Sequence, residues 1–347
     1  MGPADRRNNG KAGLQPPSSE AIVPPGWGRS MNKWVRRIIV GIVIVVVLFI
    51  AAGGVGTSML MNHLLTPGGV DWSGANNPKP PTDPYELGYR GDPLAALGLP
   101  FETVSYATEL GDAEAWFVPV ANMAGPWAVY VHGIGGIREN GYRQLSILHE
   151  AGIPTLLITY RNDKGAPGEP NPIYGFGVNE WRDLDAAVSW MLGRGAPNVI
   201  LVAESMGGAI AGQFLMHSTQ ADKVVALALD APALDFTEVV ADKIGSRMIP
   251  LARTLANAGI FVFDTYRGVQ LNKAVSMDAV AKFPGPLFLA HGTADSLVPV
   301  TISERLVAAR TAPTTYLQTG ANHLLSFKEN PERYRAEMGG FLSSLGR

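Results

Sequence analysis

Ser205 lies in the hexapeptide AESMGG (203–208), which joins a predicted buried strand to a predicted helix. The strand, Asn198–Val202, is a continuous apolar run rich in β-branched residues, as expected of a strand covered on both faces. The helix, Gly207–Met216, has very small residues in its first turn. A serine at this junction matches the nucleophile elbow G-x-S-x-G, which raises the hydroxyl above the edge of a sheet. Ala203 replaces the first glycine and is still small. The alternative is an ordinary serine in a turn. Whether the chain also offers a basic histidine and an acid for Ser205 decides between the two.

An activated serine needs a basic histidine and an acid that orients it, and after this elbow the acid precedes the histidine in the chain. The apolar run Pro286–Ala290 predicts a strand, and the loop beyond it presents Asp295. A second predicted strand, Thr314–Leu317, is followed by a loop that ends in His323. Three residues of the right chemistry therefore follow in the right order, each just beyond the C-terminal end of a predicted strand. This agreement favours a Ser–His–Asp triad.

The chain from Phe101 onward resembles the α/β-hydrolase superfamily, and most of all the membrane-anchored serine hydrolases of actinobacteria. The resemblance rests on five motifs: HGIGG (132–136), YRND (160–163), ESMGG (204–208), HGTAD (291–295) and GANH (320–323). It implies an α/β fold, with a mostly parallel central sheet, flanking helices and a helical cap insertion. It also implies that Ser205 is the nucleophile, His323 the general base and then acid, and Asp295 the orienting carboxylate. No metal or organic cofactor is expected.

The same resemblance locates an oxyanion hole. The predicted strand Trp127–Val131 runs into a glycine-rich loop that can aim a backbone N–H at the developing oxyanion. Ile134 is the expected first donor, with Gly133 as the neighbouring alternative. Met206, directly after the nucleophile, is the expected second donor.

Asp230 is the reserve acid. It ends the predicted strand Val224–Leu229, a position from which some enzymes of this superfamily supply the triad carboxylate, but the H-G-x-x-D pattern favours Asp295. His132 and His291 each precede a glycine at a strand end, where structural hydrogen bonding is favoured over a place in the pocket. The chain has no cysteine and no H-E-x-x-H spacing, so a zinc site is not expected.

The first hundred residues have a different character. Residues 1–30 are rich in Pro, Gly, Asn and Ser and are predicted to be disordered. Residues 31–61 are predicted to be a transmembrane anchor with a basic flank, because Ile38–Met61 carries no charge and about 20 apolar residues span a bilayer. A signal peptide cleaved near Ala51–Gly53 is the alternative, although the preceding leader is long for one. Seven Lys/Arg against two acids precede the span, which predicts a cytoplasmic N-terminus and an extracytoplasmic catalytic domain.

Residues 62–100 are Pro/Gly-rich and are predicted to be a stiff linker that holds the domain off the membrane. Residues 101–347 are predicted to be the catalytic domain, beginning with two antiparallel strands. Within it, about 233–284 exceeds what one crossover needs and is interpreted as a helical cap, with ordinary helix packing as the alternative. An apolar cap would favour acyl chains.

A formal net charge of −2 gives no support for a nucleic-acid partner. The expected partners are the membrane, through the N-terminal helix, and a small-molecule acyl substrate, lipids included. Carboxylesterase or lipase-like activity is favoured, with thioesterase, acyltransferase and peptidase activities open, and a membrane-displayed binding module as the non-catalytic alternative. Three acidic residues near the start of the predicted helix Val178–Leu192 are expected to be solvated: Glu180, Asp183 and Asp185.

Overall fold

In the computed structural model, residues 32–72, 74 and 77–346 are described, and the predicted disordered tail 1–30 lies outside them. The chain divides into two compact units, Met1–Val47 and Leu48–Arg347. An eight-stranded sheet with the order β1-β2-β4-β3-β5-β6-β7-β8 organises the second unit. Its strands are β1 (Glu102–Thr108), β2 (Gly111–Val118), β3 (Trp127–Val131), β4 (Thr155–Ile158), β5 (Val199–Glu204), β6 (Val224–Asp230), β7 (Leu287–Gly292) and β8 (Thr314–Thr319).

The sheet is antiparallel at one edge and parallel elsewhere. β1 and β2 pair antiparallel, as predicted for the first two strands of the domain, and β2 also pairs antiparallel with β4. All pairs from β4 to β8 are parallel. The strands β3, β4, β5 and β7 are buried at every position, because helices cover both faces of the parallel part and each strand is a continuous apolar run.

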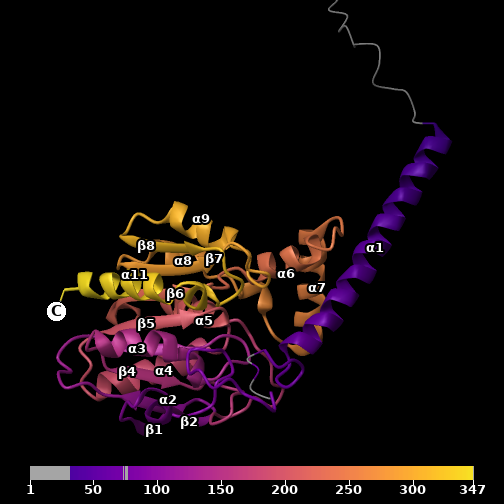
Figure 1. Cartoon of the computed structure of the whole chain (residues 1–347). Helices are drawn as coiled ribbons and strands as arrows, with labels where there is room; N and C mark the ends of the chain where they lie inside the picture. The colour runs from indigo at the N-terminus through magenta and orange to yellow at the C-terminus, as the bar shows by residue number, and fades with distance from the viewer. Residues whose placement is uncertain (1–31, 73, 75–76, 347) are drawn as a thin grey trace, which may run out of the picture. The chain divides into compact units, whose positions relative to one another are not determined.

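Helices cover the two faces of this sheet in two separate apolar layers (Figure 1). One layer holds α3 (Tyr142–Glu150), α10 (Ser326–Glu329) and α11 (Pro331–Ser344). The other holds α4 (Trp181–Gly193), α5 (Met206–His217), α8 (Met277–Lys282) and α9 (Thr301–Ala309). Along β3, Val129 contributes to one layer and Tyr130 to the other, which is the alternation of side chains that any strand imposes. This architecture confirms the predicted α/β-hydrolase fold class.

The helical insertion after β6 is smaller than predicted. It contains α6 (Phe236–Gly245) and α7 (Ala252–Arg267), which pack on each other, and the short 3-10 turn Leu271–Lys273. α8, by contrast, packs on α5 and α9 and belongs to the layer on the sheet. The predicted cap of about 233–284 therefore includes a helix of the main body.

The N-terminal helix α1 runs from Lys33 to Leu65. At 1.5 Å per residue its 33 residues extend about 50 Å, more than the ~30 Å of a bilayer's hydrocarbon core. By length and composition it is the one helix among the described residues that could cross a membrane. Its last part, from Leu48, belongs to the second unit, and there it buries the side chains of Ser58, Met61 and Leu65.

The segment 62–100, predicted to be a stiff linker, packs against the catalytic domain. Its first residues continue α1, and the segment packs on the sheet-covering layer of α3 and α11 through tyrosines and leucines. The Tyr85 ring lies 5.4 Å from that of Phe327, and the Tyr89 ring lies 6.0 Å from that of Tyr142. The short helix α2 (Pro93–Leu97) lies in the same segment. Burial of this aromatic area holds the segment against the domain.

Two of the acidic residues expected to be solvated are buried. The Asp183 carboxylate pairs with Arg161, from Oδ2 to Nε at 2.8 Å, and is inaccessible to solvent. Glu180 accepts backbone N–H groups of Gly175 and Gly177 at 2.5 and 3.0 Å. Burial raises the pKa of Glu180, and these hydrogen bonds oppose the shift. Asp183 has its partner in another loop and Glu180 has its partners in the loop just before its own helix, and helical periodicity reveals neither.

Candidate active site

Ser205 lies on a strained turn between β5 and α5. Its backbone angles are φ 52° and ψ −120°, a region that non-glycine residues rarely adopt. The turn is tight because α5 begins against the sheet: a Cβ on Gly207 would lie 2.2 Å from the Val131 carbonyl oxygen. The Ser205 N–H donates to the Asp230 carbonyl at 2.9 Å. The local sequence thus forms an elbow that exposes the Ser205 hydroxyl to a cavity.

Three side chains predicted from the sequence meet at this elbow. His323 Nε2 lies 2.9 Å from Ser205 Oγ, and His323 Nδ1 lies 2.6 Å from Asp295 Oδ2. The loop after β8 carries His323, and the loop after β7 carries Asp295. The two loops are joined by Asn322, whose Oδ1 accepts the N–H of Ser296 and that of His323, both at 2.8 Å. The arrangement suits proton transfer from the serine to the imidazole.

The Asp295 carboxylate is fully buried and fully bonded. Its Oδ1 accepts the N–H groups of Leu297 and Val298 at 2.8 Å each, and its Oδ2 also lies 3.2 Å from His291 Nε2. Burial by itself raises the pKa of Asp295. The hydrogen bonds from His291 and His323 outweigh burial and hold the pKa below its ordinary value. Asp295 therefore remains an anion that can orient and stabilise His323.

Asp230, the reserve acid, has other partners. Its Oδ2 accepts the hydroxyl of Tyr334 at 3.1 Å, and its backbone carbonyl binds Ser205. Burial raises the pKa of Asp230 to about 6, against the opposing charge of Arg143. The carboxylate that binds His323 is Asp295, so Asp230 belongs to the layer behind Ser205.

The backbone at the expected oxyanion hole is oriented by a buried tyrosine. The Gly133 carbonyl accepts the Tyr160 hydroxyl and the Gly136 N–H, both at 3.0 Å. In a trans peptide the N–H of the next residue points the opposite way, so these bonds turn the Ile134 N–H away from Tyr160. A Cβ on Gly133 would lie 3.0 Å from Ser205 Cβ, which shows how closely this loop approaches the nucleophile. Among the described residues, neither the Ile134 N–H nor the Met206 N–H has a protein acceptor.

His132 and His291 are both buried and hydrogen-bonded. His132 Nε2 lies 2.9 Å from Asp163 Oδ2. Burial lowers the pKa of His132, but the Asp163 carboxylate outweighs burial and raises it. His291 Nδ1 lies 2.6 Å from Ser303 Oγ, and its Nε2 faces Asp295. Both histidines therefore have structural partners, and neither lines the cavity.

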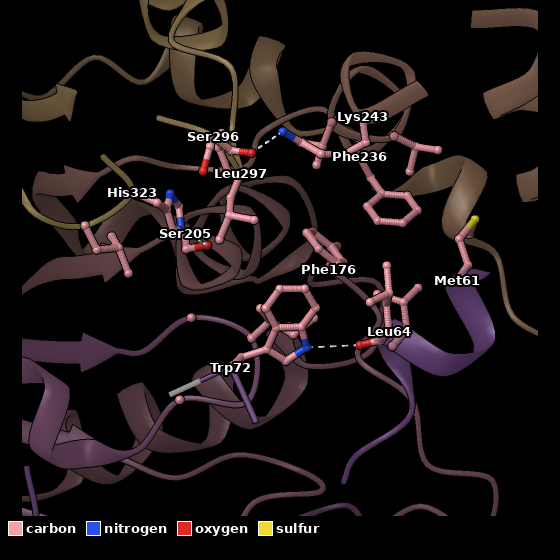
Figure 2. A pocket seen from close by; sticks show the side chains of 18 of the residues that line it. Met61, Leu64, Trp72, Phe176, Ser205, Phe236, Lys243, Ser296, Leu297 and His323 are labelled. Carbon is pink, nitrogen blue, oxygen red and sulfur yellow. Dashed lines mark hydrogen bonds between the residues drawn. The ribbon is translucent and has the colours of Figure 1, made fainter. Parts of the chain in front are cut away.

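A cavity of about 530 Å³ opens at Ser205 and His323. Figure 2 shows these two residues on one side and Met61 and Leu64 of α1 on the other, with Trp72 and Phe176 between them. The remaining apolar lining comes mainly from α6 and from the loops after β7 and β8: Phe236, Val239, Val240, Ile244, Leu297, Val298 and Leu324. In the described part of the chain, no cluster of three His, Cys, Asp or Glu could hold a metal ion.

Comparison with known proteins identifies the family. Residues 128–337 match the family model described as the alpha/beta hydrolase family, which is more than half of the chain. The chain belongs to the alpha/beta hydrolase family. This confirms the superfamily resemblance, whereas the likeness to membrane-anchored actinobacterial enzymes stays a prediction.

The relatives of this alpha/beta hydrolase support its fold. An uncharacterized protein of Mycobacterium tuberculosis is 29% identical over 206 residues, which cover 58% of this chain and 64% of that protein's length. The uncharacterized protein YfhR of Escherichia coli O157:H7 is 26% identical over 265 residues, with coverage of 74% and 84%. An esterase of Pyrococcus furiosus superposes with a TM-score of 0.56 at 18% identity, covering 77% of this chain and all of that one.

One pair of buried charges escaped the sequence analysis. Arg143, on α3, places Nη2 2.5 Å from Glu204 Oε2 and donates from Nη1 to the Leu324 carbonyl at 2.6 Å. Glu204 directly precedes Ser205 and Leu324 directly follows His323, so Arg143 connects the two segments that carry Ser205 and His323. Its partners are 61 and 181 residues away in the chain, and no local pattern links them.

Proposed function

We propose that this alpha/beta hydrolase is a membrane-anchored serine hydrolase that cleaves a carboxylic ester, in the manner of a carboxylesterase or lipase. The observation that carries the proposal is the continuous line of hydrogen bonds from Ser205 through His323 to the anionic Asp295, at the mouth of an apolar cavity. The fold it shares with esterases is consistent with this activity.

In the acylation step, Ser205 Oγ attacks the ester carbonyl carbon while His323 Nε2 takes the hydroxyl proton. The carbonyl oxygen becomes an oxyanion, which the backbone N–H groups of Ile134 and Met206 stabilise. Each such donor typically contributes about 3–4 kcal/mol to the transition state. Asp295 stabilises the imidazolium that forms on His323. When the tetrahedral intermediate collapses, the C–O bond to the alcohol breaks and His323 returns its proton to the leaving oxygen.

In the deacylation step, water replaces the alcohol. His323 takes a proton from the water as its oxygen attacks the acyl-serine carbonyl. The second tetrahedral intermediate collapses, the Ser205 ester bond breaks, and the proton returns to Ser205 Oγ. The carboxylic acid leaves and the enzyme is restored. Because the Ile134 and Met206 donors serve both intermediates, one oxyanion hole suffices for the whole cycle.

We also propose that α1 remains as an uncleaved anchor, with its N-terminus in the cytoplasm and the catalytic domain outside. The large apolar side chains from Trp34 to Phe49 are exposed, which suits contact with lipid. The later turns of α1 are part of the second unit, so the helix serves the domain as well as the membrane. A phosphatase reporter fused after Arg347 should be active outside the cytoplasm, and a mature N-terminus near Gly53 would show cleavage instead.

The activity is tested by labelling the full chain, in detergent, with a fluorophosphonate probe. In such a probe an activated serine oxygen attacks phosphorus, the P–O bond forms and fluoride leaves as the P–F bond breaks, so the natural substrate need not be known. We expect labelling of the wild type and of Ser343→Ala, an exposed serine control, and none of Ser205→Ala or His323→Ala. A folded wild type that stays unlabelled would refute the serine mechanism and favour a binding module.

A further inference from the structure

The N-terminal helix itself lines the cavity at Ser205. Five residues of its last three turns line the cavity: Thr57, Leu60, Met61, Leu64 and Leu65. They face Ser205 and His323 across the cavity, as Met61 and Leu64 show in Figure 2. These turns follow directly on the exposed apolar part of α1, in one unbroken helix. A helix long enough to span a bilayer thus also contributes a wall of the candidate active site.

Specific hydrogen bonds fix this wall in place. The Leu64 carbonyl accepts the Trp72 indole N–H at 3.1 Å, a bond drawn in Figure 2. The Leu65 carbonyl accepts the Tyr174 N–H at 2.8 Å. The Asn62 side chain accepts from Arg267, the last residue of α7, at 2.6 Å. These bonds satisfy the carbonyls that the end of a helix leaves free, so the last turn has a defined position.

Small residues bring α1 close to α7. A Cβ on Gly259 would lie 2.4 Å from Thr57 Cγ2, and a Cβ on Gly54 would lie 2.9 Å from Ala258 Cβ. Close approach through glycines is the packing that membrane helices use, because it depends on van der Waals contact and not on exclusion of water. The last turns of α1 are therefore in close van der Waals contact with α7.

The cavity offers an elongated substrate very different surroundings at its two ends. Ser205, His323, Asn322 and Ser296 are polar, whereas α1 contributes one hydroxyl and four aliphatic or thioether side chains. Arg247, which follows α6 and also lines the cavity, donates to the Lys243 carbonyl at 2.9 Å. The Lys243 ammonium, which also lines the cavity, already donates to the Ser296 carbonyl and pairs with Asp242 at 3.1 Å. An ester group at Ser205 would therefore extend its apolar end towards α1.

We propose that the last turns of α1 bind the acyl chain, so that the substrate is a long-chain acyl ester and Leu60, Met61 and Leu64 determine chain-length specificity. This inference rests on the proposed serine hydrolase activity. Transfer of a methylene group from water into such a cavity strengthens binding by about 0.8 kcal/mol, a factor of about four. Reactivity should therefore rise about fourfold per methylene until the chain reaches α1.

The test uses a series of alkyl fluorophosphonates, from ethyl to dodecyl, on the full chain reconstituted in nanodiscs. The second-order rate constant of inactivation measures binding of the alkyl chain without any assumption about the natural ester. For the wild type we expect this rate constant to rise by at least 100-fold between the ethyl and decyl probes. If all chain lengths react equally, this inference is overturned while the serine mechanism stands. If none reacts, both fail.

The Leu64→Trp variant tests the proposal most directly, because the larger indole would fill the end of the cavity at α1. We expect inactivation by the decyl probe to fall at least tenfold and inactivation by the ethyl probe to stay within twofold. Met59→Trp is the matched control: Met59 lies on the same helix, is 69% exposed and does not line the cavity, so its profile should equal that of the wild type. A variant that does not react with the ethyl probe is misfolded, and Leu60→Trp then replaces it. Equal profiles for a folded cavity variant and Met59→Trp would overturn the proposal.

Two sources could supply the long-chain ester, a bilayer lipid or a dissolved amphiphile. Fatty-acid release from phosphatidylcholine vesicles containing the reconstituted chain would identify the bilayer as the source. Hydrolysis of p-nitrophenyl decanoate alone would identify a dissolved ester. In either case the same Leu64→Trp variant should lower the rate, and an unchanged rate would overturn the assignment of α1 as the acyl-chain wall.

Discussion

The two walls of the cavity are built in different ways. The sheet wall presents Ser205, Asp295 and His323 from three loops at strand ends, and hydrogen bonds shorter than 3.0 Å connect them. The helical wall, formed by α1 and α6, presents mostly aliphatic side chains and packs on α7 through glycines. The sheet wall has the precision that proton transfer requires, whereas the helical wall has the shape and apolarity that select a chain. Chemistry and selectivity should therefore respond to different substitutions.

The largest effect is expected for the sheet wall. Asp295→Asn keeps the size of the side chain but removes the charge that orients and stabilises His323. We expect kcat to fall about 10⁴-fold, as for a triad acid, with little change in KM. Ester hydrolysis at saturating substrate measures this. A decrease in kcat of less than tenfold would show that ester hydrolysis does not depend on the Asp295 carboxylate.

The charges behind the sheet wall should matter for stability. Arg143→Met leaves Glu204 buried without its partner, which typically costs about 3–5 kcal/mol. We expect the double variant Arg143→Met/Glu204→Gln to be more stable than the single one, because the uncompensated charge is gone. Urea unfolding of the three proteins gives the free energies. Equal stability of the wild type and Arg143→Met would contradict the structural role assigned to the pair.

Asp230 and Asp295, the two carboxylates at this edge of the sheet, should respond differently to pH. Because burial raises the pKa of Asp230 to about 6, the folded state holds a proton between pH 4 and 6 that the unfolded state has released. Stability then falls as pH rises through this range, by about 3 kcal/mol for a shift from the ordinary pKa near 4. Asp230→Asn removes this loss, so its unfolding free energy relative to the wild type should increase from pH 4 to pH 7. A pH-independent difference would show that Asp230 does not titrate there.

The smallest effect is expected for the helical wall. Gly259→Ala places a methyl group against Thr57, and we expect the unfolding free energy to fall by about 1–3 kcal/mol. Gly340→Ala is the matched control, since it is also helical but has open space at the Cβ position. There the same substitution should stabilise by up to about 1 kcal/mol. Thermal unfolding of both variants measures the change in Tm. If Tm shifts in the same direction for Gly259→Ala and Gly340→Ala, α1 and α7 are not in tight contact.

The strands and the positions of the candidate site residues were predictable because they follow from local patterns. The predicted strand Trp127–Val131 has the same bounds as β3, since a strand buried on both faces is a continuous apolar run. The elbow could be located because the residue two positions after Ser205, Gly207, must be small where α5 meets the sheet. The H-G-x-x-D pattern then favoured Asp295 over Asp230, and the structure bonds Asp295 to His323.

Residues whose partners lie far along the chain were not predictable. The burial of Asp183 depends on Arg161, and the position of Arg143 depends on Glu204. The segment 62–100 looked like a spacer because it is rich in prolines and glycines, while the ring contacts of Tyr85 and Tyr89 exist only after folding. A favourable tertiary contact overrides the local preference of such a segment.

The sequence by itself determined the sheet, the elbow and the identity of the serine, histidine and carboxylate, because each is encoded in a short run of residues with its own steric requirement. The tertiary structure alone decided which buried charges pair and that the end of α1 forms a wall of the cavity. The physical reason is that hydrogen bonds and packing act through space. The identity of a partner tens of residues away or more is therefore set by the fold and not by local periodicity.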